Sequence, residues 1–131
     1  MIKKITLKKH KDDKTPYGIE LIMDLHDCNL EGLVNKKKLT EFFVKLCKKI
    51  DMKRHGDPLF WEDYSDIPHL RGVSAMQFIE TSTIVCHPLP MLKSVYINVF
   101  SCKNFDAETA LEFCMNFWRA KKESHTVVTR T

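Results

Sequence analysis

The sequence predicts an α+β fold, a two-layer sandwich in which an antiparallel sheet carries its helices on one face. Short runs of alternating apolar and polar residues predict strands, and two longer stretches with apolar residues at helical spacing predict helices. In chain order, the predicted elements read β-α-β-β-β-α-β. With 131 residues, of which 44% are hydrophobic and 29% charged, the chain suits one folded domain.

The chain begins with a polar, lysine-rich segment, residues 1–16, that ends at a proline. We expect this segment to be a flexible extension or an added edge strand, with the domain proper in residues 17–131. The first strand of that domain is predicted where apolar and polar residues alternate with a period of two. Its apolar members are Ile19, Leu21, Met23 and Leu25.

A helix is predicted after Asn35, whose side chain suits an N-cap. Apolar residues, including Cys47, form one stripe of this helix and are expected in the core, while lysines fill the other face. The stripe consists of Leu39, Phe42, Phe43, Leu46, Cys47 and Ile50. The following segment, residues 57–70, is aromatic and acidic, and we expect it to hold a short strand and a loop.

Three β-rich runs come next, at residues 73–79, 82–87 and 94–102. Glu80 and Thr81 fall at the break between the first two runs, which indicates a hairpin. These runs form the middle of the predicted sheet.

The C-terminal part of the chain predicts a second helix and a last strand. Asp106 suits the N-cap of the helix. Arg119, Lys121 and Lys122 are expected to place cations in its last turn, where they suit the helix dipole. Residues 124–131 are rich in valine and threonine and predict the final strand.

Composition and spacing argue against several classes of function. The five cysteines are scattered without a Cys-x-x-Cys pair, which suits a reducing compartment. We expect no metal, because Cys86 and His87 are adjacent on a strand and point to opposite faces, so they do not form a zinc site with Cys102. The lysines behind the net charge of +4 are typical of an outer helix face, so no nucleic acid partner is expected. No apolar run suits a membrane span or a signal peptide, so we expect no membrane partner and a cytoplasmic protein.

The most informative stretch of the chain lies between Gly72 and Cys102. Residues 72–88 read GVSAMQFIETSTIVCHP, and residues 99–102 read VFSC. This stretch resembles, without a gap, the self-processing segment of the small prokaryotic S-adenosylmethionine decarboxylases, which make their own pyruvoyl cofactor from an internal serine. The resemblance extends, at lower specificity, from Gly18 to the C-terminus.

The resemblance implies roles for four residues and a cleavage site. Ser82 takes the place of the serine that becomes the pyruvoyl group and binds the substrate as a Schiff base, with cleavage between Thr81 and Ser82. Ser74 and His87 take the places of two residues that assist processing, with His87 as the base for the α-proton. Cys102 takes the place of the cysteine that protonates the product. The implied activity is decarboxylation of S-adenosylmethionine to the aminopropyl donor for spermidine synthesis.

The hairpin geometry predicts that one active site combines residues of two chains. With Glu80 and Thr81 as a tight turn, Ser74 lies opposite His87. Ser82 is five residues from His87, which is roughly 16 Å along an extended strand. Ser74 and His87 therefore do not reach the serine of their own chain, and we expect a homodimer with shared active sites, as the resembled family forms.

Two positions depart from the family pattern. Thr81 stands where the family carries Glu before the processed serine, and Met91 stands where its members usually carry Glu near the nucleoside end of the substrate. Two alternatives therefore stay open: a pyruvoyl-dependent decarboxylase of another amino acid, such as arginine or ornithine, and an unprocessed homologue with a binding role. A thiol hydrolase built on His87 and Cys102 lacks an orienting acid and is not favoured.

Overall fold

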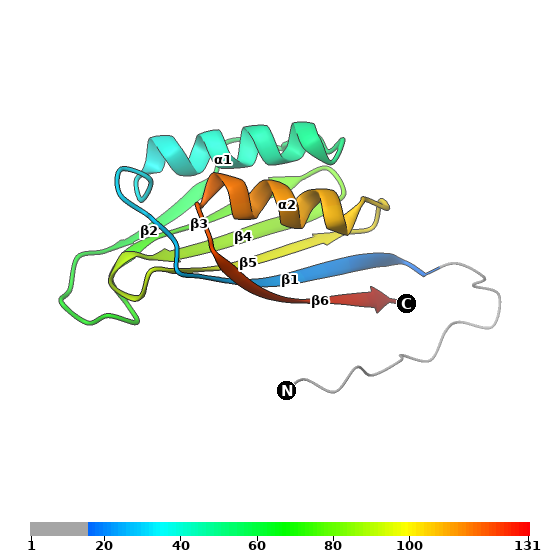
Figure 1. Ribbon diagram of the computed structural model, residues 1–131. Coiled ribbons are helices and arrows are strands. Elements are labelled where there is room, and N and C mark those ends of the chain that lie inside the picture. The colour runs from blue at the N-terminus through cyan, green and yellow to red at the C-terminus, as the bar shows by residue number, and fades with distance from the viewer. Residues whose placement is uncertain (1–15) are drawn as a thin grey trace.

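The computed structural model describes residues 16–131, so almost all of the expected N-terminal extension lies outside the described residues. The described chain forms a six-stranded antiparallel sheet with the strand order β2-β3-β4-β5-β1-β6. Figure 1 shows both α-helices on the same face of this sheet, which is the predicted two-layer sandwich. The elements are β1 (Gly18–His26), α1 (Lys36–Lys49), β2 (Leu59–Asp63), β3 (Gly72–Ile79), β4 (Ser82–Leu89), the 3-10 helix η1 (Pro90–Leu92), β5 (Ser94–Ser101), α2 (Ala107–Phe117) and β6 (Lys122–Arg130).

Strand β2 adds one strand to the predicted order of elements. It comes from the segment expected to hold a short strand and a loop, and it pairs with β3 at the edge of the sheet, with Trp61 opposite Ser74. None of its five residues is buried. An edge strand of this kind lacks the clear alternation of buried and exposed residues that marks the central strands in a sequence.

Both α-helices begin at the predicted capping residues. The Asn35 side chain accepts a hydrogen bond of 2.8 Å from the Lys38 N–H. The Asp106 side chain accepts bonds from the N–H groups of Glu108 and Thr109. Neither helix of the described chain is long and apolar enough to cross a membrane. The two helix starts are thus set locally, because each cap satisfies N–H groups that have no partner inside the helix.

The end of α2 differs from the prediction. The helix stops before Arg119, Lys121 and Lys122, so the cations expected in its last turn lie beyond it. Arg119 adopts a φ of 52°, and the N–H of Ala120 donates back to the carbonyl of Met115 at 2.9 Å. This left-handed residue and its returning hydrogen bond form a Schellman motif, which ends the helix earlier than the charge pattern indicated.

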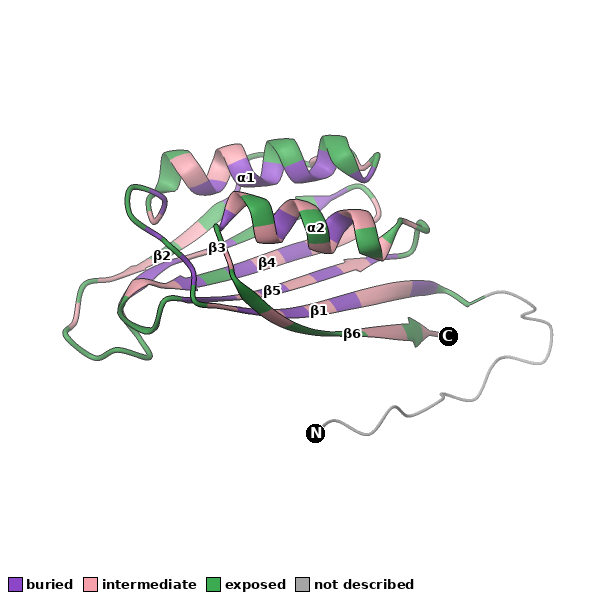
Figure 2. Ribbon diagram, viewed as in Figure 1, coloured by how far each residue is buried: buried purple, intermediate pink, exposed green. Residues whose placement is uncertain are grey.

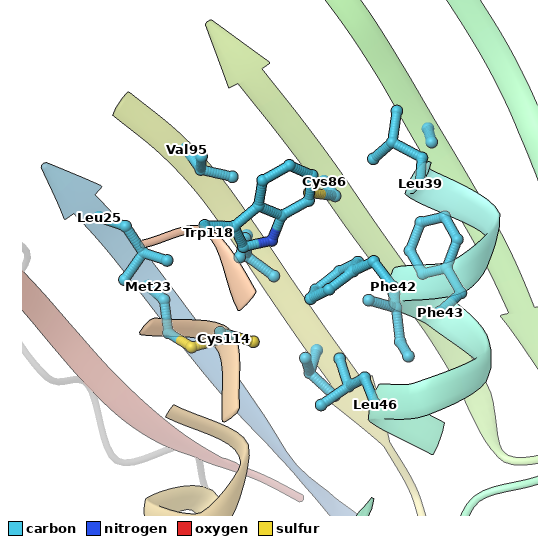
Figure 3. Packing of buried hydrophobic residues seen from close by; sticks show 14 of the residues in the cluster. Met23, Leu25, Leu39, Phe42, Phe43, Leu46, Cys86, Val95, Cys114 and Trp118 are labelled. Carbon is cyan, nitrogen blue, oxygen red and sulfur yellow. The ribbon is translucent and has the colours of Figure 1, made fainter. Parts of the chain in front are cut away.

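The hydrophobic core lies between the two helices and the covered face of the sheet. Figure 2 shows buried residues alternating with less buried ones along the central strands. In Figure 3, Phe42 of α1 and Trp118 at the end of α2 lie next to each other, with ring centroids 5.2 Å apart. Cys47 belongs to this core with 3% of its surface exposed, as predicted.

No helix of residues 16–131 lies on the other face of the sheet, which is called the open face below (Figure 1). Its side chains alternate along β3 and β4 with the buried ones that point toward the helices. The open face therefore mixes polar groups with exposed apolar ones. Its members on β2, β3 and β4 include Leu59, Trp61, Ser74, Met76, Phe78, Val85 and His87.

Candidate active site

The β3–β4 hairpin has the register predicted from a two-residue turn. Ile79 pairs with Ser82 directly across the turn. Further along the same strands, Nδ1 of His87 and Oγ of Ser74 share a hydrogen bond of 2.8 Å. The structure thus brings Ser74 and His87 together on the open face.

His87 lies between two shallow hollows of the open face. One hollow, of about 220 Å³, is mostly apolar, and Trp61 and Met76 contribute to its lining. The other hollow, of about 470 Å³, is lined in part by Asp24 and Tyr96. Partial burial lowers the pKa of His87, because loss of solvent disfavours the charged imidazolium. The ring is therefore kept neutral, in the form that can accept a proton.

A second group of predicted site residues meets at the start of β4. The backbone N–H of Cys102 donates a hydrogen bond of 2.9 Å to the carbonyl oxygen of Thr81. Ser82 pairs with Ser101 of the neighbouring strand β5. The Cys102 side chain is exposed. The structure thus places Cys102 directly beside the Thr81–Ser82 peptide bond.

The backbone at Ser82 is strained. Its φ of 155° lies in the region that glycine favours. Such a conformation costs a residue with a side chain on the order of 1–3 kcal/mol. Within the described chain, the Ser82 hydroxyl makes no hydrogen bond. A strained backbone at Ser82, a carbonyl polarised by a backbone N–H and an unengaged hydroxyl on the next residue suit an internal acyl transfer.

The two groups of site residues do not meet within one chain. Ser82 and His87 both belong to strand β4 and are five residues apart. At about 3.3 Å per residue this separation is roughly 16 Å. Each chain therefore carries two separate halves of the predicted site.

Two further residues at this end of the sheet were missed from the sequence: Ser101, which contacts Thr81, and Gly18, which packs on Ser101 and Cys102. Ser101 Oγ donates a hydrogen bond of 2.8 Å to Thr81 Oγ1. Gly18 packs so closely on this strand end that a Cβ added to it would overlap the carbonyl oxygen of Ser101. The available signals were weak, because Ser101 was marked only by its place before Cys102 and Gly18 only by its place at the start of the resemblance.

Cys86 and His87, which are adjacent in the sequence, lie on opposite faces of the sheet. Cys86 is buried on the covered face of the sheet, and its burial raises the pKa of the thiol well above its ordinary value. His87 points to the open face. Among residues 16–131, no group of three His, Cys, Asp or Glu side chains is arranged to hold a metal ion.

Comparison with known sequences shows which protein family the chain matches. The model of the S-adenosylmethionine decarboxylase family matches residues 19–131. Two similar proteins, both named S-adenosylmethionine decarboxylase proenzyme, come from Clostridium botulinum. The chain is 28% identical to that of strain Langeland over 97 residues, which are 73% of this chain and 78% of the relative. It is 30% identical to that of strain Hall over 90 residues, which are 68% and 72% of the two chains.

A solved structure has the same fold. It is the crystal structure of the adenosylmethionine decarboxylase from Aquifex aeolicus VF5, which matches with a TM-score of 0.73 and 15% sequence identity. The match covers 88% of this chain and 92% of that chain. The resemblance predicted from the sequence is thus confirmed at the level of family and fold. Because the family model spans nearly all of the described residues, the chain belongs to the S-adenosylmethionine decarboxylase family, a family of carboxy-lyases.

Proposed function

We propose that the chain is the proenzyme of an S-adenosylmethionine decarboxylase that cleaves itself between Thr81 and Ser82. The observation that carries the proposal is the hydrogen bond from the Cys102 N–H to the Thr81 carbonyl, beside the unengaged hydroxyl of Ser82. Family membership and the proenzyme names of the relatives support it.

The biological role follows from the same proposal. The reaction product is the aminopropyl donor for spermidine synthesis, and we assign catalysis to residues 17–131, with residues 1–16 as an extension. The five cysteines are all free, which suits the reducing conditions of the cytoplasm.

The first step of the proposed cleavage converts the peptide bond into an ester. Ser82 Oγ attacks the carbonyl carbon of Thr81, and the carbonyl oxygen takes the electron pair of the double bond. The N–H of Cys102, at 2.9 Å, stabilises the charge on that oxygen. The carbon–nitrogen bond then breaks, the nitrogen gains the proton that the hydroxyl lost, and Thr81 is left as an ester on the Ser82 side chain.

The second step removes this ester by elimination. A base takes the α-proton of Ser82, the Cα–Cβ double bond forms, and the Cβ–Oγ bond breaks, so Thr81 leaves as a carboxylate. Proton transfer to Cβ and hydrolysis by one water then release ammonia and leave a pyruvoyl group at the start of residues 82–131. We assign His87 as the base, because its lowered pKa keeps the ring neutral and Ser74 fixes the ring through Nδ1.

The residues present fit a pyruvoyl group at position 82. Ser82 contributes its three carbons, and the chain break falls at the strained start of β4. Once formed, the group supplies the electron sink that decarboxylation of an amino acid needs. Cys102 is exposed beside this position, and we assign its thiol to deliver the proton that the product carbon takes up after carbon dioxide leaves.

We propose that two copies of the chain complete each other's sites. Within one chain, His87 is roughly 16 Å from Ser82, which is too far for proton transfer. On the open face near Ser74, 72% of Trp61 and 45% of Phe78 are exposed, and apolar surface of this kind is typical of protein contacts. A second copy packed on the open face would bury these side chains and bring the Ser74–His87 pair to the partner's Ser82.

Cleavage should remain fast at pH values below the ordinary histidine pKa of about 6.5. Burial lowers the pKa of His87, so the neutral base persists as the pH falls and is lost only below the lowered pKa. The check is the initial rate of fragment formation, followed by denaturing mass analysis from acidic to neutral pH. A rate that already falls off at or above pH 6.5 would contradict this assignment of the base.

The substrate is tested by measuring carbon dioxide release from S-adenosylmethionine, arginine and ornithine with the cleaved protein. We expect release from S-adenosylmethionine alone. Release from arginine or ornithine alone would instead favour a basic amino acid decarboxylase, an alternative suggested by the exposed, uncharged Met91 in η1. If no carbon dioxide is released from any of the three substrates despite complete cleavage, both decarboxylase assignments would be contradicted.

The variant Cys102→Ala separates the effect on cleavage from the effect on turnover. Alanine keeps the backbone N–H that binds the Thr81 carbonyl, so cleavage should proceed at nearly the wild-type rate. Turnover should fall because the thiol is needed only after carbon dioxide departs. Equal loss of cleavage and turnover would show that the substitution acts on folding or processing instead.

A further inference from the structure

The backbone on both sides of the proposed cleavage site is held by residues distant in sequence. The N–H of Glu80 donates to the carbonyl of Lys53 at 2.9 Å, and the carbonyl of Thr81 accepts from the N–H of Cys102 at 2.9 Å. Lys53 belongs to the loop after α1, and Cys102 follows β5. The turn is therefore fixed by backbone hydrogen bonds to two other segments, the loop after α1 and the end of β5.

The side chain of Thr81 is held by further hydrogen bonds. Ser101 Oγ donates to Thr81 Oγ1 at 2.8 Å, and Thr81 Oγ1 donates to the Met52 sulfur at 3.3 Å. Ser101 Oγ in turn accepts from the N–H of Lys103 at 3.0 Å. Ser101 is fully buried, and its hydroxyl also lies 3.7 Å from the Met52 sulfur, a longer contact than the one to Thr81.

The hydroxyls of the adjacent residues Thr81 and Ser82 differ in their hydrogen bonding. The Thr81 hydroxyl is hydrogen-bonded to Ser101 Oγ at 2.8 Å and to the Met52 sulfur at 3.3 Å, which fixes its orientation. The Ser82 hydroxyl has no hydrogen bond in the described chain and is next to a carbonyl already polarised by Cys102. The free hydroxyl and the polarised carbonyl therefore flank the same bond, Thr81–Ser82.

We propose that Ser101 is a positioning residue for self-cleavage. It acts through Thr81: by fixing the Thr81 side chain, it keeps the Thr81 carbonyl on the Cys102 N–H and within reach of Ser82 Oγ. Ser101 itself exchanges no proton or bond in the acyl transfer described above. The inference rests on the proposed self-cleavage and adds the reason why a threonine is tolerated before the processed serine in this chain.

The test compares cleavage rates of the full-length protein, measured by denaturing mass analysis of freshly purified chains. Ser101→Ala should slow cleavage about tenfold, since the hydrogen bond to Thr81 is lost together with the one from the Lys103 N–H. Ser101→Thr, which keeps the hydroxyl, should recover most of the rate. Thermal melting of each variant checks that the fold is intact, so that a slow but folded variant reports positioning and not stability.

Thr81→Val provides a second variant, which leaves Ser101 itself in place. It removes the other partner of the same hydrogen bond and should also slow cleavage about tenfold. The double variant Ser101→Ala, Thr81→Val should be much faster than the product of the two single effects predicts, because both substitutions remove the Ser101–Thr81 hydrogen bond. The matched control is Thr83→Val, whose hydroxyl makes no hydrogen bond among the described residues and whose loss should leave the rate unchanged.

The outcomes separate this inference from the proposed function. A wild-type chain that is never cleaved would overturn the self-cleavage on which the inference rests. A wild-type chain that is cleaved, together with a folded Ser101→Ala chain cleaved at the same rate, would overturn the role of Ser101 alone. Independent, multiplying effects of Ser101→Ala and Thr81→Val would also overturn it, because the two residues would then not act through each other.

Discussion

Chains carrying Ser82→Ala and chains carrying His87→Ala, each uncleaved alone, are expected to restore cleavage when they assemble together. In a mixed dimer, the Ser82 of the His87→Ala chain faces the partner's His87 and Ser74, so one complete site forms. With random pairing of equal amounts, up to about half of the His87→Ala chains should be cut. A mass tag on one variant identifies which chain is cleaved, and only the His87→Ala chain should be.

The size of this effect follows from the separation of the two halves of the site. Ser74 and His87 are joined by a 2.8 Å hydrogen bond on the open face. Ser82 is roughly 16 Å away on the same strand, so no side-chain rotation joins the two groups within a chain. Complementation therefore changes cleavage from none to a large fraction of one chain.

The control mixture combines Ser82→Ala with a chain that carries both substitutions. No mixed dimer of this pair holds a complete site, so all chains should stay intact. If wild type is cleaved but the first mixture, shown to contain mixed dimers, stays uncut, the site belongs to a single chain. The shared-site account would then be wrong.

The hairpin at the centre of the site was predictable because its determinants are local. A two-residue break at Glu80 and Thr81 fixes the register of the strands on either side. The register places Ser74 opposite His87, and the structure has these side chains in contact. The start of each helix was predictable for the same reason, since each capping residue acts on N–H groups two or three positions away.

The geometry of the cleavage site itself was not predictable from local pattern. It depends on the end of β5 and the loop after α1 packing on the hairpin turn, where Cys102 and Met52 bond to Thr81. The spacing of apolar residues carries no information on these long-range contacts or on the φ of 155° at Ser82. The early end of α2 had a similar cause, because a backbone turn at Arg119 outweighs the preference of cations for the last helical turn.

The substitution Ser82→Ala should abolish cleavage completely and leave the fold unchanged. Alanine lacks the hydroxyl that attacks the Thr81 carbonyl, and no other residue supplies the carbons of the pyruvoyl group. The Thr81 hydroxyl does not replace it, because in the same reaction it would attack a different carbonyl, that of Glu80. Carbon dioxide release by this variant should not exceed the background without protein.

Denaturing mass analysis of the purified wild-type protein beside the Ser82→Ala variant tests self-cleavage most directly. The account predicts two wild-type fragments, residues 1–81 with a free carboxylate and residues 82–131 with a pyruvoyl group at the first position. It predicts a single intact mass for Ser82→Ala. A wild-type protein that keeps one intact mass after prolonged incubation, or fragments divided at another bond, would contradict it.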